Sequence, residues 1–501
     1  MPASYLDYLR ILPEIILAVF GALILMIEGA ARGGSRGKLA GTLAFIGSLL
    51  ALGASIYLIR DPGPAFAGMV SWDAISIYFH ILMLATVVVV TLLAMDYLRV
   101  QEHPRGEFYA LLLFAAVGMG LMANSENLIL TFIGLEISSI SSYVLCAYRR
   151  HAAESTEAAL KYLLLGSFAT AFFLYGIALL YGASASVSLP AIGQGLAGKM
   201  AAGGLAPGSL IPLAAALIFV GLGFKVSAAP FQVWTPDVYQ GAPALVTGFI
   251  STAAKAAAFI ILLRVFYIGL RGYHQQWFWL MWVAAILSMS LGNIAALRQT
   301  NLKRMLAYSS IAQAGYILVA FAVIAQNPAP TLQPGQTADA AGWMSGAGVG
   351  AILFYLTVYT AMNLGAFAVI ARVANRGERF TQLSDFAGLG KRHPGLALAM
   401  TLFMLSLLGV PFTGGFLGKL YIFQSAFQAH LIGLAIVALV NTVIAAWYYL
   451  RVVVYMYMRP AEGELLPIAA SPAWTLGAIC CAAVVLWLGI LPGNLLHWLP
   501  K

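Results

Sequence analysis

The feature that most constrains this chain is a series of about fourteen apolar runs, each close to the ~20 residues that an α-helix needs to cross a bilayer. The runs cover residues 11–31, 39–59, 74–97, 107–124, 127–148, 157–182, 209–235, 243–269, 276–297, 302–325, 346–373, 395–428, 431–458 and 472–497. Charged residues make up only 9% of the chain, whereas soluble domains carry roughly 25%. The sequence therefore predicts an all-α polytopic membrane protein, with residues 1–501 in a single membrane domain.

The loops between the runs predict the orientation, because Lys and Arg concentrate in cytoplasmic loops. Alternate loops hold most of the loop cations: Arg32, Arg36, Lys38, Arg99, Arg105, Arg149, Arg150, Arg298, Lys303, Arg304, Arg372, Arg376, Arg379, Lys391, Arg392, Arg451 and Arg459. The opposite loops and the two ends hold only Arg10, Arg60, Lys199, Arg271 and Lys501. Both termini are thus expected on the non-cytoplasmic side. Orientation explains the net charge of +9 better than nucleic-acid binding does.

Five cations are left unassigned to the loops or the ends and lie inside the apolar runs, namely Lys161, Lys225, Lys255, Arg264 and Lys419. A charge at the centre of a membrane helix costs roughly 2.5–3.5 kcal/mol, so such residues usually face the protein interior and carry function. Lys255 lies near the middle of its run among alanines. Arg264 lies near the end of the same run and is expected to be an interfacial anchor. The four lysines are the functional candidates.

Glu136 is the one acidic residue at the centre of a span. A buried charge is tolerated mainly when an opposite charge accompanies it. We therefore expect Glu136 to pair with Lys225 or Lys161. A static structural ion pair is the alternative to a role in proton transfer.

Prolines interrupt two of the predicted spans. Pro230 and Pro236 follow Lys225, and Pro411 precedes Lys419. Because proline removes a backbone donor and clashes with the preceding turn, both helices are expected to break beside a lysine. Freed carbonyls at this depth must be covered by protein or water, which predicts hydrated pockets. Proline kinks that serve packing alone are the alternative.

The two interruptions suggest a repeat. They are five spans apart, so residues 107–269 and 276–458 are expected to form two five-helix units in inverted orientation, as in many ion transporters. Residues 1–98 would add three N-terminal helices and residues 472–497 a C-terminal helix. Polar side chains in the second unit, Tyr308, Gln313 and Asn363, could connect Lys255 to Lys419 through water. Simple interhelical hydrogen bonds are the alternative for each.

No pattern in the chain predicts a cofactor. Cys146, Cys480 and Cys481 lack C-x-x-C spacing, and the seven histidines lack H-x-x-x-H spacing, the patterns of zinc and iron–sulfur sites. The chain also shows no P-loop and no Rossmann glycine motif. We therefore expect neither metal nor cofactor here, and the energy for transport would come from another chain.

At these residues the chain resembles the antiporter-like membrane subunits of respiratory complex I. The resemblance is carried by GFKVSAAPFQVWTPDVYQGAP (223–243), STAAKAAAF, NLKRMLAYSSIAQAGY (301–316), LSDFAGLGKRHP (383–394), LGVPFTGGFLGK and NTVIAAWYYLRVVVY (441–455). Trp234, Pro236 and Asp237 match the family string. Gln232 departs from it, because the family usually has histidine there.

The resemblance implies that Glu136 and Lys225 form the family's glutamate–lysine pair, and that Lys255, Lys419 and Lys161 are its other membrane lysines. It implies a proton-translocating subunit of NADH:quinone oxidoreductase in a bacterial inner membrane, with other complex I membrane subunits, including antiporter-like neighbours, as partners. FMN, iron–sulfur clusters and quinone would belong to other subunits. A subunit of a multisubunit cation/proton antiporter is the alternative. The mechanistic hypothesis is proton passage from Lys225 through Lys255 to Lys419, controlled by the Glu136–Lys225 separation.

Overall fold

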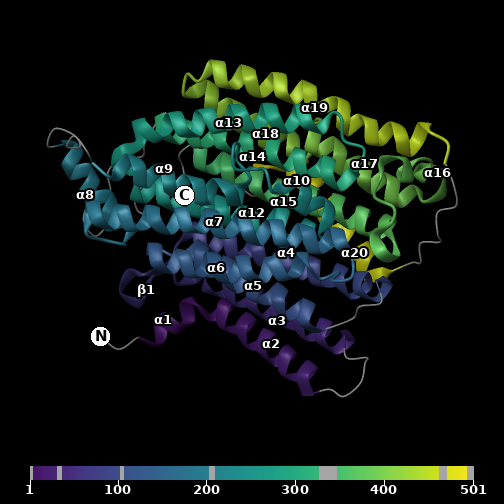
Figure 1. Cartoon of the computed structure of the whole chain (residues 1–501), viewed down its shortest axis with the longest axis horizontal. Coiled ribbons are helices and arrows are strands. Elements are labelled where there is room, and N and C mark those ends of the chain that lie inside the picture. The colour runs from purple at the N-terminus through teal and green to yellow at the C-terminus, as the bar shows by residue number, and fades with distance from the viewer. Residues whose placement is uncertain are drawn as a thin grey trace.

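The computed structural model describes residues 4–30, 37–101, 106–201, 209–326, 347–461 and 471–493. Its helices lie side by side along the long axis of the molecule, from α2 and α3 at one edge to α19 at the other (Figure 1). The described part contains twelve helices that are long and apolar enough to cross a membrane. They are α2 (Leu12–Ala30), α3 (Gly37–Tyr57), α4 (Ala74–Val100), α5 (Gly106–Asn124), α6 (Leu128–Cys146), α7 (Ala153–Ser184), the composite helix of α11 (Ala244–Phe249), η3 (Ile250–Ala254), α12 (Lys255–Leu263) and η4 (Arg264–Gly269), then α13 (His274–Ala296), α14 (Leu302–Gln326), α15 (Ala347–Ala374), α19 (Ile432–Met458) and α20 (Pro472–Ile490).

The two remaining predicted spans are broken helices. The first consists of α9 (Ile211–Val226) and α10 (Thr235–Gly241), and the second of α17 (Pro394–Leu408) and α18 (Gly414–Gln428). With these two, the predicted set of about fourteen spans is confirmed. The division into units 107–269 and 276–458 stays a prediction.

Each break has a local cause. Helix α9 ends where Ser227 adopts a left-handed backbone conformation with φ of 61°, and the segment that follows contains the cis peptide bond Ala229–Pro230. Helix α17 ends at Gly409, whose φ of 94° is easily adopted only by glycine. Pro411 lies in the five-residue gap before α18. The predicted interruptions at Pro230, Pro236 and Pro411 are therefore confirmed.

Small elements join the helices at the two ends of the bundle. Helix α1 (Tyr5–Arg10), strand β1 (Gly63–Ala65) and helix α8 (Leu189–Ala201) lie at one end, and α16 (Leu389–Arg392) lies at the other (Figure 1). Strand β1 pairs antiparallel with β2 (Val70–Trp72). The hairpin and α8 were not predicted, because their short segments lack the periodic apolar pattern on which the prediction rests. The cations Arg32, Arg36, Arg105 and Lys501 and the end of the predicted span 472–497 lie outside the described residues.

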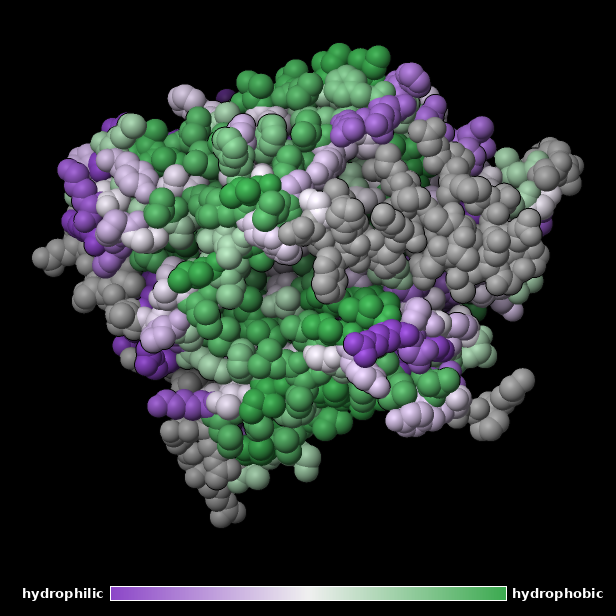
Figure 2. Space-filling model, turned by 180° about the vertical axis from the view of Figure 1, so that it is seen from behind, coloured by the Kyte–Doolittle hydropathy of each residue, from purple (hydrophilic) through white to green (hydrophobic). Residues whose placement is uncertain are grey.

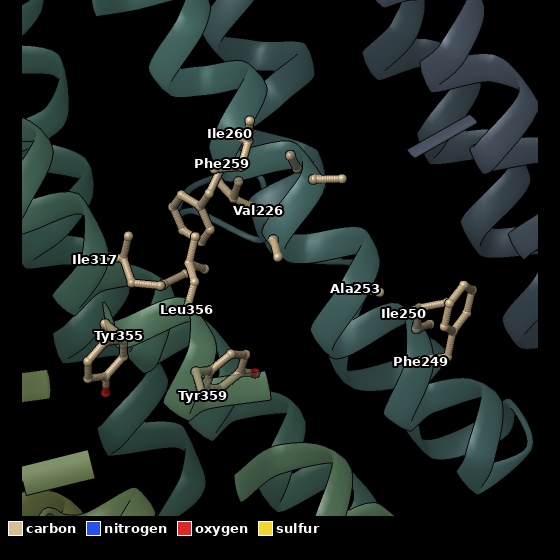
Figure 3. Close-up of a cluster of buried hydrophobic side chains, with 14 of the residues drawn as sticks. Val226, Phe249, Ile250, Ala253, Phe259, Ile260, Ile317, Tyr355, Leu356 and Tyr359 are labelled. Atoms are coloured by element: carbon tan, nitrogen blue, oxygen red, sulfur yellow. The ribbon is translucent and has the colours of Figure 1, made fainter. Parts of the chain in front are cut away.

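The surface and the centre both fit a bilayer environment. Figure 2 shows a broad apolar area across the face seen, with hydrophilic residues mainly toward its two ends. Inside, the composite helix, α14 and α15 are almost entirely buried by other helices. Their apolar side chains interlock, as Phe259, Ile317 and Leu356 do in Figure 3. Charged groups on these three helices are thus held away from lipid.

Candidate functional site

Lys225 lies in the last turn of α9, directly before the first break. It is half-buried and lines a cavity together with Met122, Ser138 and Ala254. The cavity offers about 20 Å³ to the centres of water molecules, and roughly 10–15 Å³ is enough for one. The Nζ atom lies 5.2 Å from the ring centroids of both Tyr143 and Tyr162. The lysine thus lies beside a small pocket that can hold water, as the broken helix predicted.

Glu136 lies on α6, the helix whose residues Ser138, Ser139 and Ser142 line the same cavity as Lys225. No carboxylate of the described residues lies within 4.0 Å of Lys225 Nζ, so the two groups do not form a direct ion pair. Glu136 Oε1 is buried without a hydrogen-bond partner in the described part of the chain. The pair is therefore separated in this conformation, with polar atoms free for water.

Aromatic side chains hold the broken segment in place. The ring of Trp234 stacks on Tyr162 at 4.4 Å between centroids, and its Nε1 donates to the carbonyl of Phe224 at 3.0 Å. That carbonyl lies in the last turn of α9 and also accepts from the amide of Ser227. Pro236 lies in the first turn of α10, where its missing N–H costs nothing. Trp234 and Pro236 are thus supports of the break and do not contact Lys225 Nζ.

Lys255 is the most deeply buried lysine of the predicted set, with 1% of its surface exposed. It follows the π-helical segment Ile250–Ala254, a local widening often found at functional sites. Its Nζ donates to the carbonyl and the hydroxyl of Ser310. Tyr359 donates to the same hydroxyl at 2.8 Å. Lys255 therefore faces α14 and α15.

The composite helix stands between Lys225 and Lys255. Its residues Ile250, Ala254 and Ala258 line the Lys225 cavity, and they recur at the four-residue spacing of one helix face. Lys255 leaves the helix on another face, toward Ser310. Lys225 and Lys255 therefore lie against different faces of the composite helix.

Lys419 lies in α18 and reaches back across the second break. Its Nζ donates to the carbonyls of Leu407 and Leu408 at 3.1 and 2.9 Å. These residues are the last two of α17, so their carbonyls lack helical partners. The negative end of a helix dipole favours a cation at this position.

Gln313 connects Lys419 to the α14 side of the molecule. Its Nε2 donates to the carbonyl of Leu407 at 3.1 Å, which is one of the two carbonyls that Lys419 binds. Gln313 lies three residues after Ser310 on α14, so about 4.5 Å along the helix axis separates the two positions. We call Lys255, Ser310, Gln313, the Leu407 carbonyl and Lys419 the lysine chain. One step in it, from Ser310 to Gln313, has no direct hydrogen bond among the described residues.

Two other predicted connecting residues are placed apart from the lysine chain. The ring of Tyr308 lies 5.9 Å from the guanidinium of Arg304. Asn363 donates to the hydroxyl of Ser251 at 2.7 Å, which joins α15 to the composite helix. Of the three predicted connecting residues, only Gln313 contacts a group that binds a lysine.

Lys161 lies in a separate polar cluster. Its Nζ forms ion pairs with Glu157 at 2.7 Å and Asp237 at 2.6 Å, and 41% of its side chain is exposed. Asp237 also pairs with Arg304 at 2.6 Å. The prediction that Lys161 is a possible partner of Glu136 is therefore wrong, because two nearer carboxylates hold it. The cluster, with Glu154, encloses a cavity of about 180 Å³, which we call the Lys161 cavity.

Arg264 corrects another prediction. It is not an interfacial anchor, because 1% of its surface is exposed. Its guanidinium donates to Asp73 at 2.6 Å, to the Ser76 hydroxyl at 2.7 Å and to the Ala123 carbonyl at 2.6 Å. Helix α4 and the end of α5 cover this end of the composite helix. The position of Arg264 near the end of an apolar run could not reveal this covering.

Sequence reasoning also missed a buried ion cluster around Glu378. Its carboxylate accepts from Tyr97 at 2.7 Å, from Lys303 at 2.7 Å and from Arg149 at 3.2 Å. The sequence predicts Lys303 to be a loop cation, yet its side chain is 1% exposed. Burial raises the pKa of Glu378, but the charges of Lys303 and Arg149 outweigh burial and hold that pKa below its ordinary value. The sequence did offer one sign, because Lys303 lies inside the predicted span 302–325.

The comparisons with known proteins agree with this geometry. Residues 125–330 and 338–445 match the family model described as NADH:quinone oxidoreductase/Mrp antiporter, TM. The chain is 48% identical to NADH-quinone oxidoreductase subunit N 2 of Koribacter versatilis, over 99% of this chain and 96% of that one. It is 45% identical to subunit N 1 of Solibacter usitatus, over 99% and 97%.

Solved structures give the same picture. A chain of respiratory complex I from Thermus thermophilus with bound aureothin matches with a TM-score of 0.79 at 35% identity, covering 97% of this chain and 98% of that one. A chain of the Mrp complex from Dietzia matches with a TM-score of 0.80, but its 20% identity shows the fold alone. Since the family model covers most of the chain and full-length relatives exceed 40% identity, this chain belongs to the family of NADH:quinone oxidoreductase and Mrp antiporter membrane subunits, on the subunit N side of it.

Proposed function

We propose that this chain translocates protons as a membrane subunit of a bacterial NADH:quinone oxidoreductase. The observation that carries the proposal is the lysine chain, in which Lys255 bonds Ser310 and, about one helical turn along α14, Gln313 shares a helix-end carbonyl with Lys419. Such relays of buried ionisable groups mark ion pathways in membrane proteins. Relatives named subunit N support the choice of complex. Other membrane subunits are its partners, and FMN, iron–sulfur clusters and quinone belong to other chains.

The end of a half-helix favours a protonated lysine at both breaks. Lys225 and Lys419 each lie beside the carbonyl end of a half-helix, where the dipole favours the protonated amine. A change in the Glu136–Lys225 separation would alter how strongly Lys225 holds its proton. Moving one charge across ~100 mV takes about 2.3 kcal/mol, and a charge pair near ε of 20 changes by a similar amount over a few ångströms. A change of a few ångströms in the Glu136–Lys225 separation can therefore supply about the energy needed to move one charge across the membrane potential.

The Lys161 cavity is the proposed entrance for protons. Lys161, Asp237 and Glu157 surround it, and it lies toward the end of the molecule that the loop cations assign to the cytoplasm. Both termini would then lie on the opposite, non-cytoplasmic side. Carboxylates in contact with water can collect protons and pass them to the nearby break that follows Lys225.

Purification tests the proposal against the alternative of a cation/proton antiporter. The chain, tagged and isolated in mild detergent, should carry flavin and iron–sulfur proteins with it. In vesicles, this complex should acidify one side when NADH is oxidised by quinone. Isolation without redox subunits, together with exchange of a metal cation for protons in the absence of NADH, would favour the antiporter instead.

Gln313→Met should reduce proton translocation severalfold, because methionine keeps the volume but cannot hydrogen-bond the Leu407 carbonyl beside Lys419. Gln299→Met is the matched control. The amide of Gln299 donates to the Ala295 carbonyl, outside the lysine chain. Protons moved per NADH should fall in the first variant only. Equal pumping in both variants would remove Gln313 from the pathway.

A further inference from the structure

A second buried titratable pair lies far from the lysine chain. Glu14, in the first turn of α2, is 4% exposed, and His80, in α4, is fully buried. His80 Nε2 and Glu14 Oε1 are 2.8 Å apart. Asn124, the last residue of α5, donates to the same carboxylate oxygen at 2.9 Å. Three helices therefore meet at one carboxylate in a region that water reaches poorly.

The hydrogen-bond pattern fixes how many protons this pair holds. His80 Nδ1 lies 2.6 Å from the carbonyl of Ser76, and since a carbonyl only accepts, Nδ1 carries a hydrogen. A second proton then lies between Nε2 and Oε1, either on the carboxyl or on the imidazole. Without it, two lone pairs would face each other at hydrogen-bond distance. The pair thus holds one transferable proton that can move between two adjacent atoms.

A glycine makes space for the Glu14–His80 pair, and two oxygen atoms beside the pair lack hydrogen-bond partners among the described residues. A Cβ atom at Gly120 of α5 would come within 2.9 Å of Glu14 Oε1 and 3.0 Å of His80 Nε2, so glycine is what lets the two groups meet. Glu14 Oε2 and Asn124 Oδ1 are buried and have no hydrogen-bond partner among the described residues. These two oxygens can accept from a water molecule or a proton carrier.

Four charged residues lie on the elements around the Glu14–His80 pair, namely Asp73, Arg264, Glu126 and Arg10. Asp73 caps α4 and pairs with Arg264, whose guanidinium also binds the Ser76 hydroxyl. Glu126 lies 3.9 Å from the same guanidinium. Arg10 lies one helical turn before Glu14 and pairs with Asp61. Each of these charged groups is paired with another group of opposite charge. The proton shared by Glu14 and His80 is therefore not taken up by any of them.

We infer that Glu14 and His80 form a proton-holding site on the release side of the molecule. The inference rests on the proposed function for its direction. Glu14 lies in the first turn of α2, directly after α1, and α1, β1 and α8 lie at one end of the bundle (Figure 1). Lys161 is near the start of α7, whose other end leads to α8, so the Lys161 cavity lies toward the opposite end. Helix α5 joins it to the centre, because Met122 lines the Lys225 cavity and Asn124, two residues later, binds Glu14. A proton leaving Lys225 outward would meet this pair.

The test is Glu14→Gln in the intact complex. Glutamine keeps the shape and can still bond His80 but cannot release a proton, so protons moved per NADH should fall roughly fivefold. Glu28→Gln, at the other end of the same helix, is the matched control and should pump as the wild type does. The infrared difference spectrum of the wild type during turnover should contain a carboxyl band that Glu14→Gln lacks.

Other outcomes separate this inference from the proposed function. If Lys225→Met stops pumping while Glu14→Gln pumps normally, the inference fails and the function stands. If both variants pump normally, the function fails. Should Glu14→Gln not assemble, the double variant Glu14→Gln/His80→Gln decides, since its two amides can bond each other. An assembled but weakly pumping double variant supports the site. Failure to assemble, or a turnover spectrum without the band, makes the pair a structural bond and overturns the inference.

Discussion

Lys225→Met is expected to lower proton translocation at least tenfold while the complex still assembles. Methionine has nearly the same length and volume, so it can occupy the space beside Tyr143 and Tyr162. It cannot carry a proton or respond to the charge of Glu136. Loss of a positioned proton-transfer group typically costs 10²- to 10⁴-fold in the step it serves. Protons moved per NADH in vesicles measure the effect.

Lys199→Met is the control for this result. Lys199 is an exposed lysine on α8 whose amine donates to the carbonyl of Ala183, so its replacement should leave pumping unchanged. Glu136→Gln should give the same defect as Lys225→Met, because the lysine would then lack its charged partner. Wild-type pumping in both Lys225→Met and Glu136→Gln would contradict the proposed pathway, even if the chain purifies with redox subunits.

Glu378→Leu is expected to destabilise the protein by about 3–5 kcal/mol, the usual cost of removing one partner from a buried ion pair. Leucine would leave Lys303 and Arg149 without their carboxylate and the amide of Ala244 without its acceptor. The residue connects α4, α11 and α14 with the loop between α6 and α7. Thermal unfolding of the purified complex, with the yield of assembled protein, measures the loss. Glu107→Leu, an exposed glutamate at the start of α5, should change neither.

The same cluster predicts how stability depends on pH. The pKa of Glu378 in the folded protein is lower than in the unfolded chain, because Lys303 and Arg149 outweigh the effect of burial. Its contribution is therefore complete above the ordinary carboxyl pKa and is lost as pH falls through the lowered folded-state value. Unfolding of the wild type on acidification should contain this component. Its persistence in Glu378→Gln would assign the acid sensitivity to another group.

The sequence alone identifies the lysines, because the free-energy cost of a charge inside an apolar run depends only on that run. A charge within an apolar run needs a reason whatever the tertiary structure, so Lys225, Lys255 and Lys419 could be named in advance. The hydrogen-bond and ion-pair partners of these lysines could not be named from the sequence. Whether Lys161 pairs with Glu136 or Asp237 depends on which helices are neighbours, and the sequence spacing of 25 or 76 residues carries no such information.

What the sequence by itself determined is the class of fold, the number of spans and the two interruptions. Each of these follows from hydropathy and from proline and glycine within a single segment. Only the tertiary structure decided that Gln313 and Lys419 share the Leu407 carbonyl, that Arg264 is buried and that Glu14 meets His80. The physical reason is that bilayer insertion acts on one helix at a time, whereas a hydrogen bond between helices depends on how side chains pack across the whole bundle.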